Sequence, residues 1–187
     1  MYFNSAKIQE YFLFLHPSLS NKMKKILLMS DTHGYLDKAI LKYVDQADEV
    51  WHAGDIGSFK VVEELKKHAC FKAVYGNIDG QDIRSEFPLK KRFSCEKVRV
   101  LMTHIGGYPG RYTKRIKNNI TRYPPNLFIS GHSHILRVMY DKKLGFLHLN
   151  PGAVGIEGYH HVRTMLRFEI NNKEILNLEV IELGKRG

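Results

Sequence analysis

Polar side chains with oxygen or nitrogen donor atoms stand at the ends of several short apolar runs in this sequence. Carboxylate and imidazole groups together suit Mn²⁺, Fe²⁺, Ni²⁺ or Zn²⁺ better than Ca²⁺ or Mg²⁺. Two such ions, with one carboxylate bridging them, can hold a phosphate group, lower the pKa of a bound water and neutralise the charge that develops when a phosphate ester is hydrolysed. The candidate ligands are Asp31, His33, Asp55, Asn77, His104, His132 and His134.

Each of these pieces is weak evidence when it is taken alone. Asp55 follows Gly54 in a common turn pair, and a single histidine such as His104 is more often structural than a ligand. The segment 131–134 is more specific, because two histidines flank one residue directly after an apolar run. The joint occurrence of all the pieces, in this order and at strand ends, favours one common site. The remaining histidines considered, His148, His160 and His161, are assigned surface or structural roles.

The elements expected in the first half explain how these side chains could meet. Apolar runs at 25–30, 49–53 and 71–75 predict strands, and the periodicity over 36–47 and 59–69 predicts helices between them. Alternating strands and helices imply βαβ units in a layered α/β domain. The loops that follow the strands of such a sheet gather at one edge, so we expect the candidate ligands to converge there.

The second half reads as mostly strand. One basic helix is expected over 111–123, with the apolar stripe Tyr112, Ile116, Ile120 and Tyr123, and a tight turn is expected at 141–144. The whole pattern predicts two packed sheets with helices outside them. The further strands are expected at 92–95, 98–103, 127–130, 136–140, 145–149, 164–170 and 175–183.

Five pieces of the sequence together resemble the calcineurin-like metallophosphoesterases. The opening segment 30–34, the compact length and Asn150-Pro151-Gly152 are most similar to the small phosphodiesterases of the YfcE type. The resemblance extends over residues 23–183, which is nearly the whole chain. The pieces are Asp31-x-His33, Gly54-Asp55, Gly76-Asn77-x-Asp79, Thr103-His104 and Gly131-His132-Ser133-His134.

The resemblance implies an α/β fold, namely a four-layer α/β/β/α sandwich of two mixed sheets flanked by helices. It also implies a phosphodiesterase that works through a metal-bound hydroxide, with two divalent ions of which Mn is the expected one and Fe, Ni or Zn the alternatives. Asp55, Asn77 and His104 would be catalytic, and Asn77 would also contact the substrate. The implied ligands are Asp31, His33 and His134 for the first metal, Asn77, His104 and His132 for the second, and Asp55 as the bridge.

Two positions depart from the family pattern. Larger members carry a histidine directly after the asparagine and use it near the leaving group, whereas this chain has Ile78. Small members also lack that histidine, so the resemblance holds. Without a general acid at this position, slow turnover of esters with poor leaving groups is expected. Many relatives have glycine directly after the second-metal histidine, but here Ile105 precedes Gly106 and Gly107, which leaves the shape of this loop open.

The positive charge is concentrated in one stretch. Residues 84–122 hold eleven Lys or Arg and two Glu, so they account for +9 of the net charge of +10. Such a field favours anionic ligands, and we assign Arg111 to substrate binding. The charge also suits a nuclease, although no aromatic stacking motif accompanies it. The other alternative is a protein-interaction module like the retromer subunit of this fold, which the complete ligand set argues against.

Length and composition limit the domain organisation, the compartment and the class of partner. With 187 residues and 43% hydrophobic content the chain is expected to form one metallophosphoesterase domain over 23–187, preceded by an extension over 1–22 that is loosely attached or, if translation begins at Met23, not native. Its apolar run, Tyr11–Leu15, is too short for a signal peptide. Cys70 and Cys95 are read as reduced thiols of a cytoplasmic protein. The expected partner is a small phosphate ester rather than nucleic acid or a membrane, and a homo-oligomer is allowed.

Overall fold

The computed structural model describes residues 23–186, and these form two five-stranded mixed sheets. The first sheet has the order β10 (Glu174–Lys185), β9 (Val162–Asn171), β1 (Lys24–Met29), β2 (Glu49–His52) and β3 (Cys70–Ala73). The second has the order β4 (Lys90–Cys95), β5 (Val98–Thr103), β6 (Leu127–Ile129), β8 (Phe146–Pro151) and β7 (Leu136–Asp141). In the first sheet β1, β2 and β3 run parallel, and β9 and β10 complete it in antiparallel pairs. In the second sheet β5, β6 and β8 run parallel, with antiparallel β4 and β7 at its edges.

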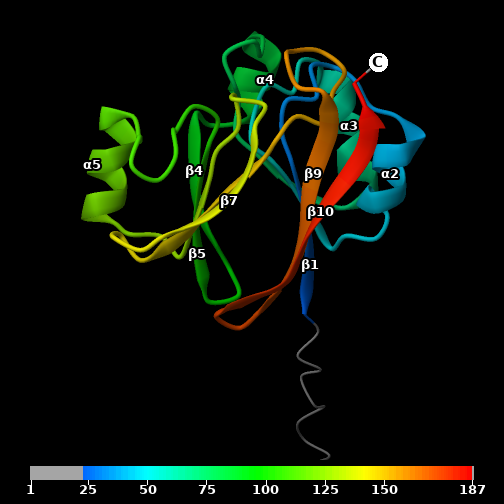
Figure 1. Ribbon diagram of the computed structural model, residues 1–187. Coiled ribbons are helices and arrows are strands. Elements are labelled where there is room, and N and C mark those ends of the chain that lie inside the picture. Colours follow the sequence, from blue (N-terminus) through cyan, green and yellow to red (C-terminus); the bar gives the residue numbers. More distant parts are fainter. Residues whose placement is uncertain (1–22, 187) are drawn as a thin grey trace, which may run out of the picture.

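Helices cover the outer face of each sheet, so the chain is a four-layer sandwich as predicted (Figure 1). The helices α2 (Lys38–Val44) and α3 (Phe59–His68) pack on the first sheet, and α4 (Gln81–Glu86) adds Ile83 to the same core. On the opposite side α5 (Lys114–Arg122) packs Ile116 and Ile120 on the second sheet. The prediction of two mixed sheets flanked by helices is confirmed.

The strand β1 shows why the first strand of the sequence is continuously apolar. Ile26 and Leu28 lie in the core between the two sheets, whereas Leu27 and Met29 lie in the core between the first sheet and its helices. Alternate side chains of a strand point to opposite faces, and both faces of this strand are buried. The central core is anchored by Trp51, whose ring lies 4.9 Å from that of Phe93 on the second sheet.

Two expectations about helices need correction. The sequence analysis did not predict α4, because this helix has six residues and only Ile83 of them is buried. The basic helix begins at Lys114 rather than at residue 111, since the Thr113 side chain accepts a hydrogen bond from the Ile116 N–H and caps it. Tyr123, expected in its apolar stripe, follows the helix and is 54% exposed.

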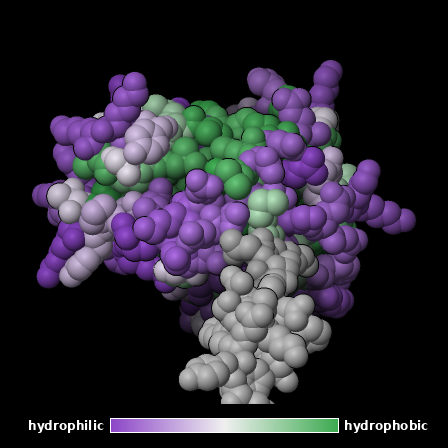
Figure 2. Space-filling view, turned by 90° about the horizontal axis from the view of Figure 1, so that it is seen from below, coloured by the Kyte–Doolittle hydropathy of each residue, from purple (hydrophilic) through white to green (hydrophobic). Residues whose placement is uncertain are grey.

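The sandwich is incompletely packed at the edge formed by β7 and β10. Val138 is in register with Leu149, and Val180 with Leu166, and both partners are buried between the sheets. Val138 and Val180 therefore face inward, yet each is 44% exposed. Seen from the end at which β1 begins, a band of apolar surface lies among charged side chains (Figure 2). Tyr140 of β7 is likewise exposed.

Replacing Phe128 with alanine is expected to lower the free energy of unfolding by about 3–5 kcal/mol, the range for removing a buried phenylalanine ring. Phe128 is fully buried, and the rings of Tyr112 and Phe146 lie 5.8 and 6.2 Å from it. Urea denaturation measures the change. Tyr159→Ala, at a fully exposed position, is the control and should change the value by less than about 0.5 kcal/mol. A loss below about 1 kcal/mol at Phe128 would contradict this description of the core.

Candidate metal centre

The predicted ligands form two clusters at one edge of the sandwich. In the first, donor atoms of Asp31, His33 and His134 all lie within 4.8 Å of one another. In the second, donor atoms of Asp55, His104 and His132 meet the same limit. These are the two groups that the family resemblance implies, apart from Asn77.

The two sheets contribute to each cluster from the ends of their parallel strands. Asp31 and Asp55 follow β1 and β2 of the first sheet, whereas His104 follows β5 and the pair His132 and His134 follows β6 of the second. Backbone hydrogen bonds hold neighbouring loops together, with Asp31 N–H donating to Gly54 O at 3.0 Å and Gly131 N–H to His104 O at 3.0 Å. The convergence expected at strand ends thus joins both sheets.

The backbone at these candidate ligands is unusual. Five of the seven candidates have a positive φ, a region that non-glycine residues enter at a cost of about 1–3 kcal/mol each. Among the other described non-glycine residues only Glu96, Asn172 and Asn177 share it. Such strain persists only where the surroundings hold it, and it clusters at functional sites. The values are 58° for Asp31, 49° for His33, 54° for Asp55, 68° for His132 and 55° for His134.

Several buried donor atoms at this edge have no hydrogen-bond partner. Within the described part of the chain there are four such buried side-chain atoms, and three of them are Asp31 Oδ1, His33 Nε2 and His104 Nε2. Asp31 Oδ2 is occupied by the His132 N–H at 3.2 Å, and His104 Nδ1 lies 2.8 Å from Ala53 O, to which it donates. Asp31 Oδ1 and His104 Nε2 therefore each keep a lone pair free, which is what a transition-metal ion requires.

Asp55 stands between the two clusters. Its Oδ2 lies 3.2 Å from His104 Nε2 of the second cluster and 3.8 Å from His33 Nε2 of the first. Its Oδ1 accepts a hydrogen bond from the Ile78 N–H at 3.1 Å. A β-carbon at position 76 would overlap this carboxylate, so only Gly76 allows the approach. The arrangement suits a carboxylate that bridges two ions.

Neighbouring imidazoles keep the two carboxylates ionised. Burial opposes the charged form of Asp31 and Asp55. The nearby imidazoles of His134 and His33 nevertheless hold the pKa of Asp31 below its ordinary value, and the nearby imidazole of His104 does the same for Asp55. Conversely, burial would lower the pKa of His104, but Asp55 and Asp31 raise it. The cluster thus already attracts positive charge at neutral pH.

Two residues that the sequence analysis did not select brace the ligand loops. His52 is fully buried, and burial lowers its pKa to about 4, so its ring is neutral. Its Nδ1 accepts from the Gly54 N–H at 3.2 Å, and its Nε2 lies 2.9 Å from the Thr32 hydroxyl. Thr32 in turn donates to Ile56 O at 3.0 Å. The only signal was a histidine at the end of an apolar strand, which is as common in structural roles.

The Asn77 loop is held by buried and charged groups. The Asp79 carboxylate accepts from the N–H groups of Gly57 and Gly76, each at 2.7 Å. The Arg84 guanidinium donates to Asp79 O at 2.6 Å and to Asn77 O at 3.0 Å. Asn77 itself is exposed, and with His104 it lines a cavity of about 450 Å³. The loop therefore places Asn77 at the cavity that His104 of the second cluster also lines.

The structure does not bring Arg111 into this cavity. Its side chain is exposed, and its N–H donates to Tyr108 O at 2.7 Å in a turn before α5. Arg84 and Arg115 line the cavity instead, together with Lys90 and Ile105. The concentration of charge in residues 84–122 pointed to the region, but sequence spacing alone did not distinguish these cations.

The loop 155–161 lies against the first cluster. His160 Nδ1 is 3.3 Å from His134 Nδ1, and Glu157 Oε2 is 3.8 Å from His33 Nδ1. His160 Nε2 lies 3.0 Å from Gly155 O, to which it donates. His160, expected to be a surface or structural residue, is thus a direct neighbour of the candidate ligand His134. His161 is exposed, and His148 is buried beside Ser130.

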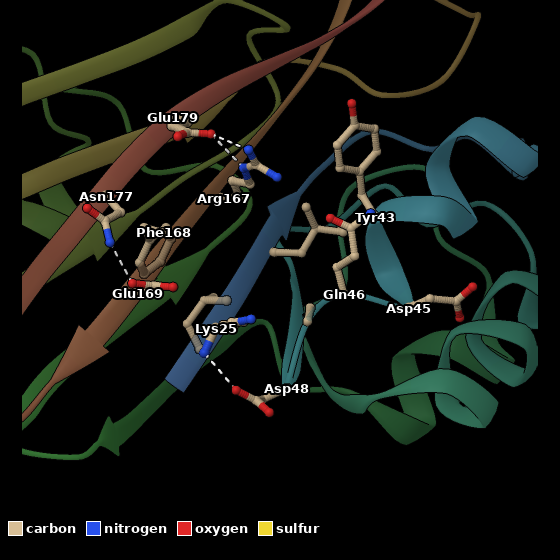
Figure 3. A pocket seen from close by; sticks show the side chains of 13 residues that line it. Lys25, Tyr43, Asp45, Gln46, Asp48, Arg167, Phe168, Glu169, Asn177 and Glu179 are labelled. Carbon is tan, nitrogen blue, oxygen red and sulfur yellow. Dashed lines mark hydrogen bonds and ion pairs between the residues drawn. The ribbon is translucent and has the colours of Figure 1, made fainter. Parts of the chain in front are cut away.

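A larger cavity, of about 550 Å³, lies elsewhere (Figure 3). None of the seven predicted ligands lines it. Several of its polar groups are paired with one another, since Arg167 bonds Glu179 at 2.6 Å and Asn177 bonds Glu169 at 2.6 Å. Its position away from the clusters and its internal pairing make it no candidate for the active site.

Known proteins share both this fold and this family. The profile of the calcineurin-like phosphoesterase superfamily domain matches residues 23–173. A probable metallophosphoesterase of Methanothermobacter thermautotrophicus is 29% identical over 165 residues, which cover 84% of this chain and 91% of that protein.

Solved structures agree with this assignment. A structure described as a novel archaeal phosphodiesterase is 27% identical with a TM-score of 0.66, covering 85% of this chain and 99% of that one. Vps29 of Entamoeba histolytica with Zn²⁺ bound has a TM-score of 0.66 at 16% identity, covering 84% and 98%, which shows a shared fold. The match over most of the chain shows that this protein belongs to the calcineurin-like phosphoesterase superfamily.

Proposed function

We propose that this metallophosphoesterase is a phosphodiesterase that depends on two divalent metal ions. The observation that carries the proposal is the set of buried donor atoms without partners, arranged in two clusters with Asp55 between them. The likeness to an archaeal phosphodiesterase supports diesters as substrates. Bound metal ions supply charge neutralisation at the phosphate and an activated water.

The ligand roles follow the two clusters. Asp31, His33 and His134 would hold one ion, and His104 and His132, with the Asn77 amide, would hold the other, while Asp55 would contribute to both. His104 cannot also transfer a proton from Nδ1, because that N–H donates to Ala53 O. Asn77 is exposed at the cavity, where its amide can donate to a phosphate oxygen. These side chains bind and orient the ester rather than protonate its leaving group.

The ligand atoms guide the choice of metal, and the cysteines guide the choice of compartment. All predicted ligands offer oxygen or nitrogen and none offers sulfur, so Mn²⁺ is the ion we propose, with Fe, Ni or Zn as alternatives. We place the protein in the cytoplasm, consistent with its free cysteines, Cys70 and Cys95. Within residues 23–186 no helix is long and apolar enough to cross a bilayer.

A homo-oligomer formed through the exposed apolar side chains of β7 and β10 is compatible with this function.

Two alternatives use other features of the chain. A nuclease would use the basic stretch 84–122, and steep loss of DNA affinity with rising salt would support it. A protein-interaction module is suggested by the Vps29 fold, but that likeness concerns the fold alone. The partnerless donor atoms favour an enzyme over a scaffold, because a scaffold gains nothing from burying them.

Replacing Asp55 with asparagine is expected to lower kcat/KM for bis(4-nitrophenyl) phosphate by more than about 100-fold. Loss of a residue that only orients a metal ligand costs about 10–100-fold, and Asp55 would contact both ions directly. The assay uses Mn²⁺-loaded protein. In a second experiment a chelator removes the metal from wild-type protein, and added Mn²⁺ then restores it. Asp45→Asn, an exposed carboxylate paired with His68, is the matched control and should retain full activity. Wild-type activity that survives chelation would contradict the proposal.

Replacing Ile78 with histidine tests whether leaving-group protonation limits turnover. Ile78 is 47% exposed, so an imidazole can be placed there without disturbing the core. We expect rates for diesters with alkyl leaving groups to rise about tenfold or more, a fraction of the ~10²–10⁴ that general acid catalysis can contribute, while nitrophenyl esters change little. Ile78→Gln is the control for polarity without proton transfer. Equal losses on both classes of ester would show that position 78 serves only the loop's structure.

A further inference from the structure

The cavity beside the second cluster has the walls of a binding site for an apolar group. Asn77 and His104 border it on one side, so anything bound there lies next to the ligands. Leu89, Ile105 and Ile116 supply apolar surface, and Ile105 is 46% exposed in the described structure. The volume of about 450 Å³ falls within the usual range for a small-molecule pocket. A single phosphate group would leave most of it empty.

The charge of this cavity is of one sign. Arg84, Lys90 and Arg115 line it, and no Asp or Glu does. Arg84 is engaged, since it donates to two backbone carbonyls and its guanidinium lies 5.0 Å from the centre of the Tyr75 ring. Lys90 and Arg115, by contrast, have no side-chain hydrogen bond or ion pair to any residue of the described chain. Two cationic groups are thus left available to a ligand.

These cations come from separate elements. Arg84 lies on α4, Lys90 on β4 and Arg115 on α5. Their neighbours Lys91 and Lys117, on the same strand and helix, do not line the cavity. The N-terminal end of α5 adds its partial positive charge on the same side, where Thr113 also lines the wall. The convergence is specific to this cavity.

We propose that this cavity binds one arm of the phosphodiester substrate, and that this arm is an apolar ring or similar group carrying a second anionic substituent, a carboxylate or a phosphate. The apolar walls would hold the body of the arm, and Lys90 and Arg115 would pair with its charge. The inference rests on the proposed phosphodiesterase function, because the phosphate that joins the two arms must sit at the adjacent clusters. It narrows the substrate class to diesters that carry charge beyond the phosphate itself.

A matched pair of diesters tests the charge requirement. The first is 4-nitrophenyl 4-carboxyphenyl phosphate, and the second carries a carboxamide in place of the carboxylate, so the two differ little in size. With Mn²⁺-loaded wild-type protein we expect KM for the carboxylate to be lower by about fivefold or more, as two partly exposed ion pairs acting together would produce. Equal KM values for the two diesters would overturn the proposal.

Variants locate the effect. In the double variant Lys90→Gln with Arg115→Gln, the ratio of the two KM values should fall toward one. In the control Lys91→Gln with Lys117→Gln, which removes the same charge from the same strand and helix outside the cavity, the ratio should stay at its wild-type value. Equal loss of the preference in both variants would show a diffuse field instead of a site, and would also overturn the proposal.

The failure of this inference is distinguishable from failure of the proposed function. If neither diester is hydrolysed, the phosphodiesterase assignment fails, and titration calorimetry of the same two compounds then makes the comparison through Kd. A preference for the carboxylate that depends on Lys90 and Arg115 would support the site in either assay. Indistinguishable Kd values would reject it.

Discussion

The architecture of the site depends on one energetic constraint, the cost of burying oxygen and nitrogen atoms that have no hydrogen-bond partner in the protein. Asp31 is fully buried, and one of its carboxylate oxygens is left without a hydrogen bond. A buried unsatisfied polar atom costs about 1–3 kcal/mol, and more when the group is charged. The neighbouring His33 and His104 each leave one ring nitrogen in the same condition. Cations at this edge would offset all these costs at once, which gives the arrangement a physical reason.

Much of the surrounding chain serves to hold these atoms in place. The two sheets bring rigid strand ends together, and hydrogen bonds such as that from the His132 N–H to Asp31 link one sheet to the other. His52 and Asp79 bond the backbone of loops whose residues have left-handed φ angles. The cores on both sides of each sheet provide the stability that such strain requires. Packing energy far from the site thus maintains its geometry.

Strand periodicity and chain order allowed prediction of two packed sheets and of one edge at which the candidate ligands converge. The division of these residues into two clusters came from the family resemblance. The sequence did not reveal the left-handed backbone of the candidate ligands, since those φ angles occur in loops that bond to one another across long stretches of sequence, as His33 N–H does to Asp55 O. The roles of Arg84 and His160 depend on how α4 and the loop 155–161 pack beside the site. The spacing of residues in the sequence does not predict this packing. α4 was missed because six residues with one buried side chain give almost no periodic signal. The extension over 1–22 lies outside the described residues, so its expectation stays a prediction.

The metal content of the intact protein tests the central claim most directly. After saturation with Mn²⁺ and removal of free ions, elemental analysis by mass spectrometry should find two ions per folded chain. The number of bound ions per chain should fall to one when either His134 or His132 is replaced by alanine, because each variant damages a different cluster. At most one ion per chain in fully loaded, folded wild-type protein would contradict the account.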